Sequence, residues 1–215
     1  MFRKLPLAVI GLILVLSLSN IALAELSIGV KAGDWIEYSV SYTGVPTEGH
    51  DISWARMEVL DVDGTSIYVA IISRYSNGST ETMNSTLNLA TGQLIDNFII
   101  PANLNAGDTF YAQYLGNVTI SKAQQQTYAG AARMVVSATV GNNTYVWDQS
   151  TGVSVEGTAE VTGYSMHTLV EDTNMWQPQE GVDLMALCLV AVLVVIVVAV
   201  VLVAVWFGRK RAASA

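Results

Sequence analysis

Side chains able to carry out catalysis are few in this sequence of 215 residues. It contains two histidines, His50 and His167, and one cysteine, Cys188, with no G-x-S-x-G, H-E-x-x-H or glycine-rich phosphate-binding motif. Catalysis needs a nucleophile, a base or a metal held within mutual reach, and an isolated histidine is more typical of a surface or core position. We therefore predict that the protein is not an enzyme and needs no cofactor.

Eighteen acidic residues leave two other kinds of chemistry open. Glycoside hydrolysis uses a pair of carboxylates, but the spacing of the acids singles out no pair. Residues 61–65 (D-V-D-G-T) resemble the start of a calcium-binding loop, yet the later ligands and the closing glutamate of an EF-hand are missing. A hairpin turn explains the same five residues, so we predict no metal site.

The clearest chemical signal is N-glycosylation. Four N-x-[S/T] sequons occur, with acceptors Asn77, Asn84, Asn117 and Asn142, whereas composition alone would give about two. Asn77 and Asn142 fall in predicted turns, where an asparagine is reachable for modification. Glycans would add solubilising bulk to an exposed domain. The alternative is a surface rich in Asn, Ser and Thr with accidental matches.

Charge is distributed unevenly along the chain. All 18 acidic residues and only five basic ones lie between residues 25 and 183, which gives this segment a charge of 5 − 18 = −13. Such a field repels DNA, RNA and anionic lipid headgroups, so we predict no nucleic-acid partner. It suits a solvated surface, weak cation binding or a high-salt setting.

The N-terminus has the pattern of an export signal. Arg3 and Lys4 precede an apolar run over residues 5–18, and an A-x-A site ends at Ala24. This order is typical of a signal peptide cleaved between Ala24 and Glu25, with an uncleaved anchor helix as the alternative.

The C-terminus has the pattern of a membrane anchor. Residues 184–207 are 24 residues without a charge, and as a helix they would span about 36 Å, enough for a hydrocarbon core of about 30 Å. Trp206 and Phe207 would lie at the bilayer interface, and the basic cluster beyond them places the C-terminus in the cytoplasm. The stop-transfer residues are Arg209, Lys210 and Arg211.

Between these ends the sequence predicts a mainly β fold. Short alternating segments separated by turn residues every eight to twelve positions are typical of an antiparallel meander, forming a curved sheet, a half-barrel or a sandwich. Residues 35–40 place odd-numbered side chains on one face and even-numbered ones on the other, and Asn77-Gly78 is a hairpin turn. Residues 124–132 are the one stretch with some helical character. The expected strands are residues 35–40, 52–62, 66–75, 81–89, 94–100, 109–114, 118–125, 132–140, 144–147, 153–162 and 165–172.

The predicted organisation therefore has five parts. They are a signal peptide (1–24), an extracytoplasmic β domain (25–173), a stalk (174–183), a transmembrane helix (184–207) and a cytoplasmic basic tail (208–215). Within the β domain, A-G-D recurs at 32–34 and 106–108, and T-G recurs at 91–92 and 151–152. Either a β unit is duplicated or favourable turn chemistry is used twice, and we favour the second.

Three stretches resemble a known family. They are residues 29–38 (G-V-K-A-G-D-W-I-E-Y), 99–108 (I-I-P-A-N-L-N-A-G-D) and 144–153 (T-Y-V-W-D-Q-S-T-G-V). Together they are similar to uncharacterised archaeal cell-surface proteins that have a signal peptide and a C-terminal anchor. The resemblance implies an archaeal envelope, and its motifs are structural rather than catalytic. A Pro-Gly-Phe sorting motif, present in some archaeal surface proteins, is missing before the predicted helix.

These observations predict a single-pass, non-catalytic protein of the cell membrane, with its β domain outside and its C-terminus in the cytoplasm. The expected partners are the lipid bilayer and either envelope proteins or surface glycans. The alternative is a carrier that shelters a lipid or another hydrophobic ligand in a half-open barrel, and a continuous apolar cavity of several hundred cubic ångströms would favour it. An extracytoplasmic hydrolase is a distant third.

Overall fold

The structure, a computed structural model, describes residues 26–47, 49–178, 189 and 192–194. Among these residues, no helix is both long and apolar enough to cross a membrane. Of the predicted transmembrane segment (184–207), only residues 189 and 192–194 are described, and they are helical. The other terminal predictions lie outside the described residues and stay predictions. These are the signal peptide (1–24), cleavage between Ala24 and Glu25, the stalk beyond residue 178, and the tail with Arg209, Lys210 and Arg211.

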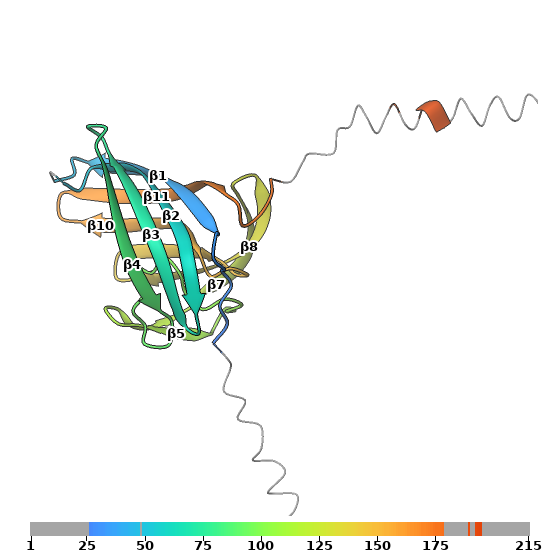
Figure 1. Cartoon of the computed structure of the whole chain (residues 1–215), viewed down its shortest axis with the longest axis horizontal. Helices are drawn as coiled ribbons and strands as arrows, with labels where there is room; N and C mark the ends of the chain where they lie inside the picture. Colours follow the sequence, from blue (N-terminus) through green and yellow to red (C-terminus); the bar gives the residue numbers. More distant parts are fainter. Residues whose placement is uncertain (1–25, 48, 179–188, 190–191, 195–215) are drawn as a thin grey trace, which may run out of the picture. The chain divides into compact units, whose positions relative to one another are not determined.

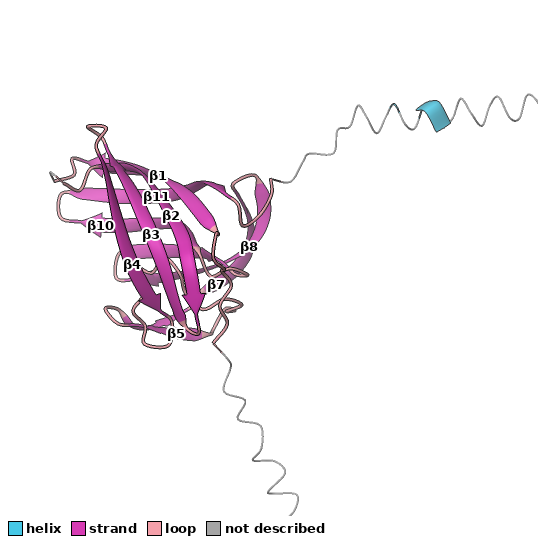
Figure 2. Cartoon of the chain, viewed as in Figure 1, coloured by secondary structure: helices cyan, strands magenta, loops and turns pink. Residues whose placement is uncertain are grey.

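Eleven β-strands make up the described part of the β domain (Figures 1 and 2). They are β1 (Trp35–Gly44), β2 (Ile52–Asp63), β3 (Ser66–Tyr75), β4 (Thr80–Asn88), β5 (Thr109–Ala112), β6 (Gly116–Thr119), β7 (Lys122–Tyr128), β8 (Ala131–Val140), β9 (Asn143–Asp148), β10 (Ser154–Val161) and β11 (Tyr164–Thr173). The prediction of a mainly β fold is confirmed.

Nine of these strands form one antiparallel sheet, in the order β4-β3-β2-β1-β11-β10-β9-β8-β7, and β5 and β6 form a separate hairpin. Neighbours in the sheet are consecutive in sequence except β1 and β11, which join two meanders into one sheet. The sheet does not close into a barrel, because β4 and β7 are its edges within the described domain. In Figure 1, β2, β3 and β4 run steeply across the front of β10 and β11, and side chains from both halves of the sheet share one hydrophobic core.

The alternation of side chains along each strand decides which residues fill that core. On β1, Ile36 and Tyr38 are buried while Trp35 and Glu37 lie half-exposed on the other face, as the sequence predicts. Strands place successive side chains on opposite faces, so one apolar row suffices to hold β1 against the core.

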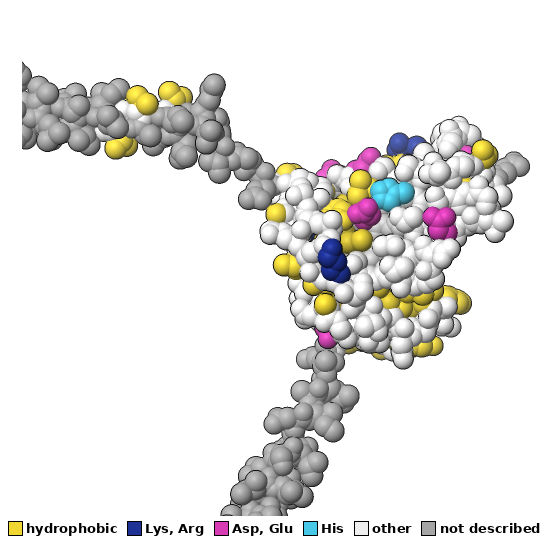
Figure 3. Space-filling view, turned by 180° about the vertical axis from the view of Figure 1, so that it is seen from behind, with side chains coloured by type: hydrophobic (Ala, Val, Ile, Leu, Met, Phe, Trp, Pro, Cys, Tyr) yellow, Lys and Arg dark blue, Asp and Glu magenta, His cyan; other side chains and the backbone are white. Residues whose placement is uncertain are grey.

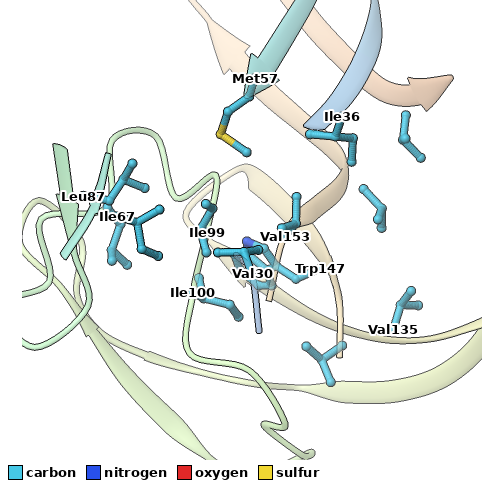
Figure 4. Close-up of a cluster of buried hydrophobic side chains, with 14 of the residues drawn as sticks. Val30, Ile36, Met57, Ile67, Leu87, Ile99, Ile100, Val135, Trp147 and Val153 are labelled. Atoms are coloured by element: carbon cyan, nitrogen blue, oxygen red, sulfur yellow. The ribbon is translucent and has the colours of Figure 1, made fainter. Parts of the chain in front are cut away.

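Trp147 of β9 lies at the centre of the core. It is fully buried, with the ring of Phe110 edge-on at 5.6 Å and the ring of Tyr145 stacked at 5.5 Å between centroids. In Figure 4, Ile99 lies between Leu87 on one side and Trp147 on the other. The inner side of the sheet is therefore packed where β5 and the segment around Ile99 cross it.

Residues 94–100 are not the strand that their apolar pattern predicts. This stretch forms no strand and has only isolated β-bridges, at Gln93 and Ile99. Ile95, Asp96 and Asn97 have φ angles of 41°, 50° and 58°. Left-handed backbone cannot continue a β-ladder, so the chain crosses the sheet as a loop. We call residues 93–100 the crossing segment.

Two further predictions were wrong in detail. The expected strand over residues 118–125 is two strands, β6 and β7, because Ile120 and Ser121 hydrogen-bond back to Asp108 and Ser137 and turn the chain between the two sheets. Residues 124–132 are not helical. They contain most of β7 and the turn into β8, where Ala129 and Gly130 have positive φ.

Candidate binding site

A pocket of about 330 Å³ opens between the crossing segment, the tip of the β5–β6 hairpin and the inner face of β9, β10 and β11. Its walls are mainly apolar, with amide and hydroxyl groups among them. Ligand sites in proteins are typically concave, mostly apolar and equipped with a few polar groups, so this pocket is the leading candidate for a binding site. The apolar lining includes Leu94, Phe98, Leu115, Tyr145, Ala159 and Met166.

The sheet wall of the pocket has a glycine at its centre. Gly157 of β10 pairs with Tyr145 on one side and Thr168 on the other, and all three line the pocket. Residues directly opposite one another share a face of the sheet, so a side chain at position 157 would project into the pocket.

The backbone does not require glycine at this position. Gly157 has no positive φ, and a Cβ atom there would meet only the carbonyl oxygen of Thr144 at 3.7 Å, an ordinary contact. Glycine within a strand weakens it and often marks a place where a ligand approaches closely. The missing side chain therefore leaves space in the pocket.

The opposite wall is held by hydrogen bonds to the core. Trp147 Nε1 donates to the carbonyl oxygen of Asn97 at 2.8 Å, and the backbone N–H of Ser154 donates to the carbonyl oxygen of Phe98 at 2.8 Å. Ile95 has left-handed φ although it is β-branched, a conformation that persists only where the surrounding structure enforces it.

The hairpin tip is joined to Gly92, the residue just before the crossing segment. The backbone N–H of Gln113 donates to the carbonyl oxygen of Gly92 at 2.8 Å. A Cβ atom at Gly92 would lie 2.6 Å from the carbonyl oxygen of Tyr111, so the two chains approach as closely as glycine permits. Both walls are thus fixed to the rest of the fold, and the pocket is preformed.

Polar groups of the pocket are almost all uncharged. Asn97, Gln113, Asn143 and Thr168 contribute amides or a hydroxyl, and Asp96 is the one charged side chain among the lining residues. Asp96 is exposed, so its carboxylate lies on the solvent side of the wall. The lining residues include no histidine, cysteine, lysine or arginine.

Asp148 is the centre of a second polar cluster, which is structural. It is fully buried and accepts hydrogen bonds from Arg133, Ser150 and Thr151, including 2.7 Å from Arg133 Nε. Burial raises the pKa of Asp148, but these donors outweigh it and hold the pKa below its ordinary value. The Arg133 guanidinium also stacks over Trp176 at 4.7 Å.

This cluster connects the end of the domain to the sheet. Trp176 is buried, and its Nε1 donates to the carbonyl oxygen of Tyr128 at 3.1 Å. The first residues of the predicted stalk therefore pack against the domain. Much of the stretch 144–153, which carried the family resemblance, is accounted for by Asp148 and by the contacts of Trp147.

The two histidines do not meet at the pocket. His167 Nε2 on β11 lies 2.9 Å from Glu156 Oε1, and Glu156 Oε2 accepts a 2.6 Å hydrogen bond from the Tyr128 hydroxyl. Burial raises the pKa of Glu156, but the bonds from Tyr128 and His167 bring it below its ordinary value. His50 lies in the loop between β1 and β2, where its ring is 3.2 Å from the hydroxyl of Thr47.

All four predicted glycosylation acceptors are exposed: Asn77, Asn84, Asn117 and Asn142. Asn77 lies in the β3–β4 turn, as the sequence predicts, and its Oδ1 accepts bonds from the backbone and hydroxyl of Ser79. Their modification stays a prediction.

Figure 3 shows one side of the domain, where uncharged polar surface predominates and hydrophobic side chains gather in a patch at the lower right.

The calcium-like stretch 61–65 is the β2–β3 hairpin, with Gly64 at positive φ. Across the described residues, no three His, Cys, Asp or Glu side chains group closely enough to hold a metal ion.

Comparison of the chain with protein-family models and with curated proteins finds no match. The function is therefore inferred from the pocket.

Sequence reasoning missed the pocket residues, although a glycine inside the predicted strand 153–162 was a usable signal.

Proposed function

We propose that the protein is a membrane-anchored, non-catalytic protein of the cell envelope. In this proposal its β domain binds a small, mainly apolar molecule in the pocket at the inner face of β9, β10 and β11. The observation that carries the proposal is a preformed apolar pocket with a glycine on its sheet wall, at a position where the backbone does not require glycine. Its volume of about 330 Å³ falls in the range of small-molecule sites, about 300–1,000 Å³.

The size of the pocket favours a compact ligand over a long lipid chain. A cavity of about 150 Å³ accommodates benzene, so this pocket has room for a molecule of one or two rings. Deeper along the inner face, Ile99, Ile100 and Trp147 are fully buried and fill the space that an acyl chain would need. The carrier of a long-chain lipid is therefore the less favoured alternative.

Location is supported by the sequence. The signal pattern and the uncharged segment 184–207 support export and anchorage in the lipid bilayer. The resemblance to archaeal surface proteins supports an envelope setting, in which envelope proteins or surface glycans would be neighbours. The lining offers no nucleophile–base pair, which supports a binding role.

The pocket can be tested by filling it. Full-length protein in lipid nanodiscs is titrated into 2-naphthol, an uncharged two-ring probe, and fluorescence anisotropy is read against empty nanodiscs. Gly157→Leu places an apolar side chain in the pocket and is expected to weaken binding at least about tenfold. Ser41→Leu, on an exposed strand position paired with His167 outside the pocket lining, is the matched control and should bind as the wild type does.

The same variant makes a prediction about stability. Replacing a strand glycine removes its entropy cost of about 0.5–1 kcal/mol, and the new side chain is buried in existing space. Gly157→Leu is therefore expected to unfold at a higher temperature than the wild type while losing the probe. A variant that folds, is stabilised and still binds 2-naphthol with wild-type affinity would contradict the proposal.

A further inference from the structure

We infer that the ligand is a compact organic cation, an apolar body with one positively charged nitrogen, held with that nitrogen near Asp96. This inference rests on the proposed function and names the ligand class for the same pocket. It is carried by the lining, which combines one carboxylate, several aromatic rings and no basic side chain.

Asp96 is placed to receive a charge at the edge of an apolar site. It is the middle residue of the three left-handed residues of the crossing segment, whose neighbour Asn97 is fixed by Trp147. The segment is thus anchored on its core side while the Asp96 side chain stays exposed. A ligand with its apolar body in the pocket would keep a charged group at this solvent-facing end, where desolvation costs least.

Aromatic side chains supply the second attraction. Tyr145 lines the pocket with its ring stacked on Trp147 at an interplanar angle of 10°, so its position is fixed. Phe98 lines the opposite wall, and Tyr114 at the hairpin tip is 87% exposed. Ring faces attract cations, and tyrosine and phenylalanine both serve in sites that recognise quaternary ammonium groups.

The charge of the domain points the same way. Residues 25–173 include 16 acidic and five basic residues, a charge of 5 − 16 = −11. Three of the five basic residues are already in ion pairs with carboxylates, namely Lys31, Arg56 and Arg133. The summed field raises the local concentration of cations and lowers that of anions, so fatty acids and other carboxylates are disfavoured.

A bare metal ion fits these features less well. Hard divalent cations take six or more oxygen ligands, several of them charged, whereas the pocket offers one carboxylate beside mainly apolar walls. An organic cation satisfies both the carboxylate and the apolar surface.

The test compares two probes of the same shape. Benzyltrimethylammonium carries the charge, and neopentylbenzene is its uncharged carbon isostere. Both are titrated against full-length protein in nanodiscs at low salt, with empty nanodiscs as the blank. The cation is expected to bind about three- to tenfold more tightly than the isostere, the range for an exposed charge contact plus ring contacts, and phenylacetate should bind more weakly than either.

Asp96→Asn is conformationally conservative, because asparagine tolerates the left-handed backbone that Asp96 adopts. It should remove the preference for benzyltrimethylammonium and leave the affinity for neopentylbenzene unchanged. Asp63→Asn removes the same unit of charge from an exposed position outside the pocket lining and is expected to keep the preference.

The outcomes separate the two proposals. If both probes bind equally, Gly157→Leu blocks both and Asp96→Asn changes nothing, the pocket is a binding site and the cation inference is overturned. If neither probe binds, or Gly157→Leu leaves binding of both probes unchanged, the proposed function fails and the inference falls with it.

Discussion

Removing the charge of Asp148 gives a sharp test of how this domain is held together. Asp148→Asn keeps the shape of the side chain but replaces one carboxylate oxygen by an NH₂ group. Oδ2 accepts from Arg133 Nε, and Oδ1 accepts from Arg133, Ser150 and Thr151. Whichever way the amide turns, its NH₂ group faces donors, and the guanidinium loses its counter-charge.

The magnitude follows from burial. Breaking a fully buried ion pair costs about 3–5 kcal/mol, and Asp148 is fully buried while the Arg133 side chain is 22% exposed. Because water can reach Arg133, we expect the low end, about 3 kcal/mol. The matched control is Glu37→Gln, which breaks another cross-strand Arg–carboxylate pair whose side chains are 24% and 26% exposed, and it should cost about 0.2–1 kcal/mol.

The assay is urea unfolding of the full-length protein in nanodiscs, followed by tryptophan fluorescence. The reasoning is refuted if Asp148→Asn and Glu37→Gln cost the same, or if Asp148→Asn costs less than about 1 kcal/mol.

The pH dependence of the free energy of unfolding is an additional check. The folded pKa of Asp148 is lowered from an ordinary value of 3.8, so its stabilisation is complete above that value and is lost as the pH falls through the folded pKa. The difference between wild type and Asp148→Asn should therefore shrink only in that acidic range.

Two further substitutions test other contacts. Tyr128→Phe removes the 2.6 Å bond to Glu156 and should lower the free energy of unfolding in urea by about 1 kcal/mol. It should also raise the pKa of Glu156 toward its ordinary value, as measured by NMR titration. An unchanged pKa would contradict the role given to this bond. Gly152→Ala would bring a Cβ atom within 2.1 Å of the carbonyl oxygen of Ile100 at a φ of 72°, whereas Gly163, at a φ of 96°, has open space. Gly163→Ala should lower the stability by about 1–2 kcal/mol through backbone strain alone. Gly152→Ala should lower it clearly more, as measured by thermal unfolding. Equal losses of stability would contradict the close approach of Gly152 to Ile100.

Local signals predicted the strands well. The alternation over residues 35–40 and the turns at 63–64 and 77–78 depend on neighbouring residues, and the structure confirms them. The order of strands depends on pairing between distant segments, which no local pattern encodes. The pairing of β1 with β11 is the clearest case.

The crossing segment shows why the site itself was missed. Residues 94–100 are rich in apolar residues, as a strand would be, and nothing local favours left-handed φ at Ile95. Tertiary bonds impose that conformation, above all the bond from Trp147 to Asn97, and the apolar residues are used to pack the core and line the pocket.

The recurring turn motifs have a physical account. In A-G-D at 32–34 and 106–108, the aspartate carboxylate accepts a hydrogen bond from the backbone N–H three residues earlier, at Lys31 and Asn105 respectively. The first motif leads into the large sheet and the second into the separate hairpin. The same turn chemistry therefore serves two different elements, in agreement with the interpretation that favourable turns are used twice.

The pairing of the first strand with the last has a consequence for how the protein matures. Tyr38 pairs with Val170 and Gly44 with Tyr164, so these contacts link residues about 120–130 positions apart. Closing such long loops is entropically costly and slows folding. During synthesis, β1–β4 are made with β1 as an unprotected edge, available to other chains until β11 arrives. Completion of the sheet is thus tied to synthesis of nearly the whole domain, and the exposed half-sheet is the stage at which a chaperone would matter most.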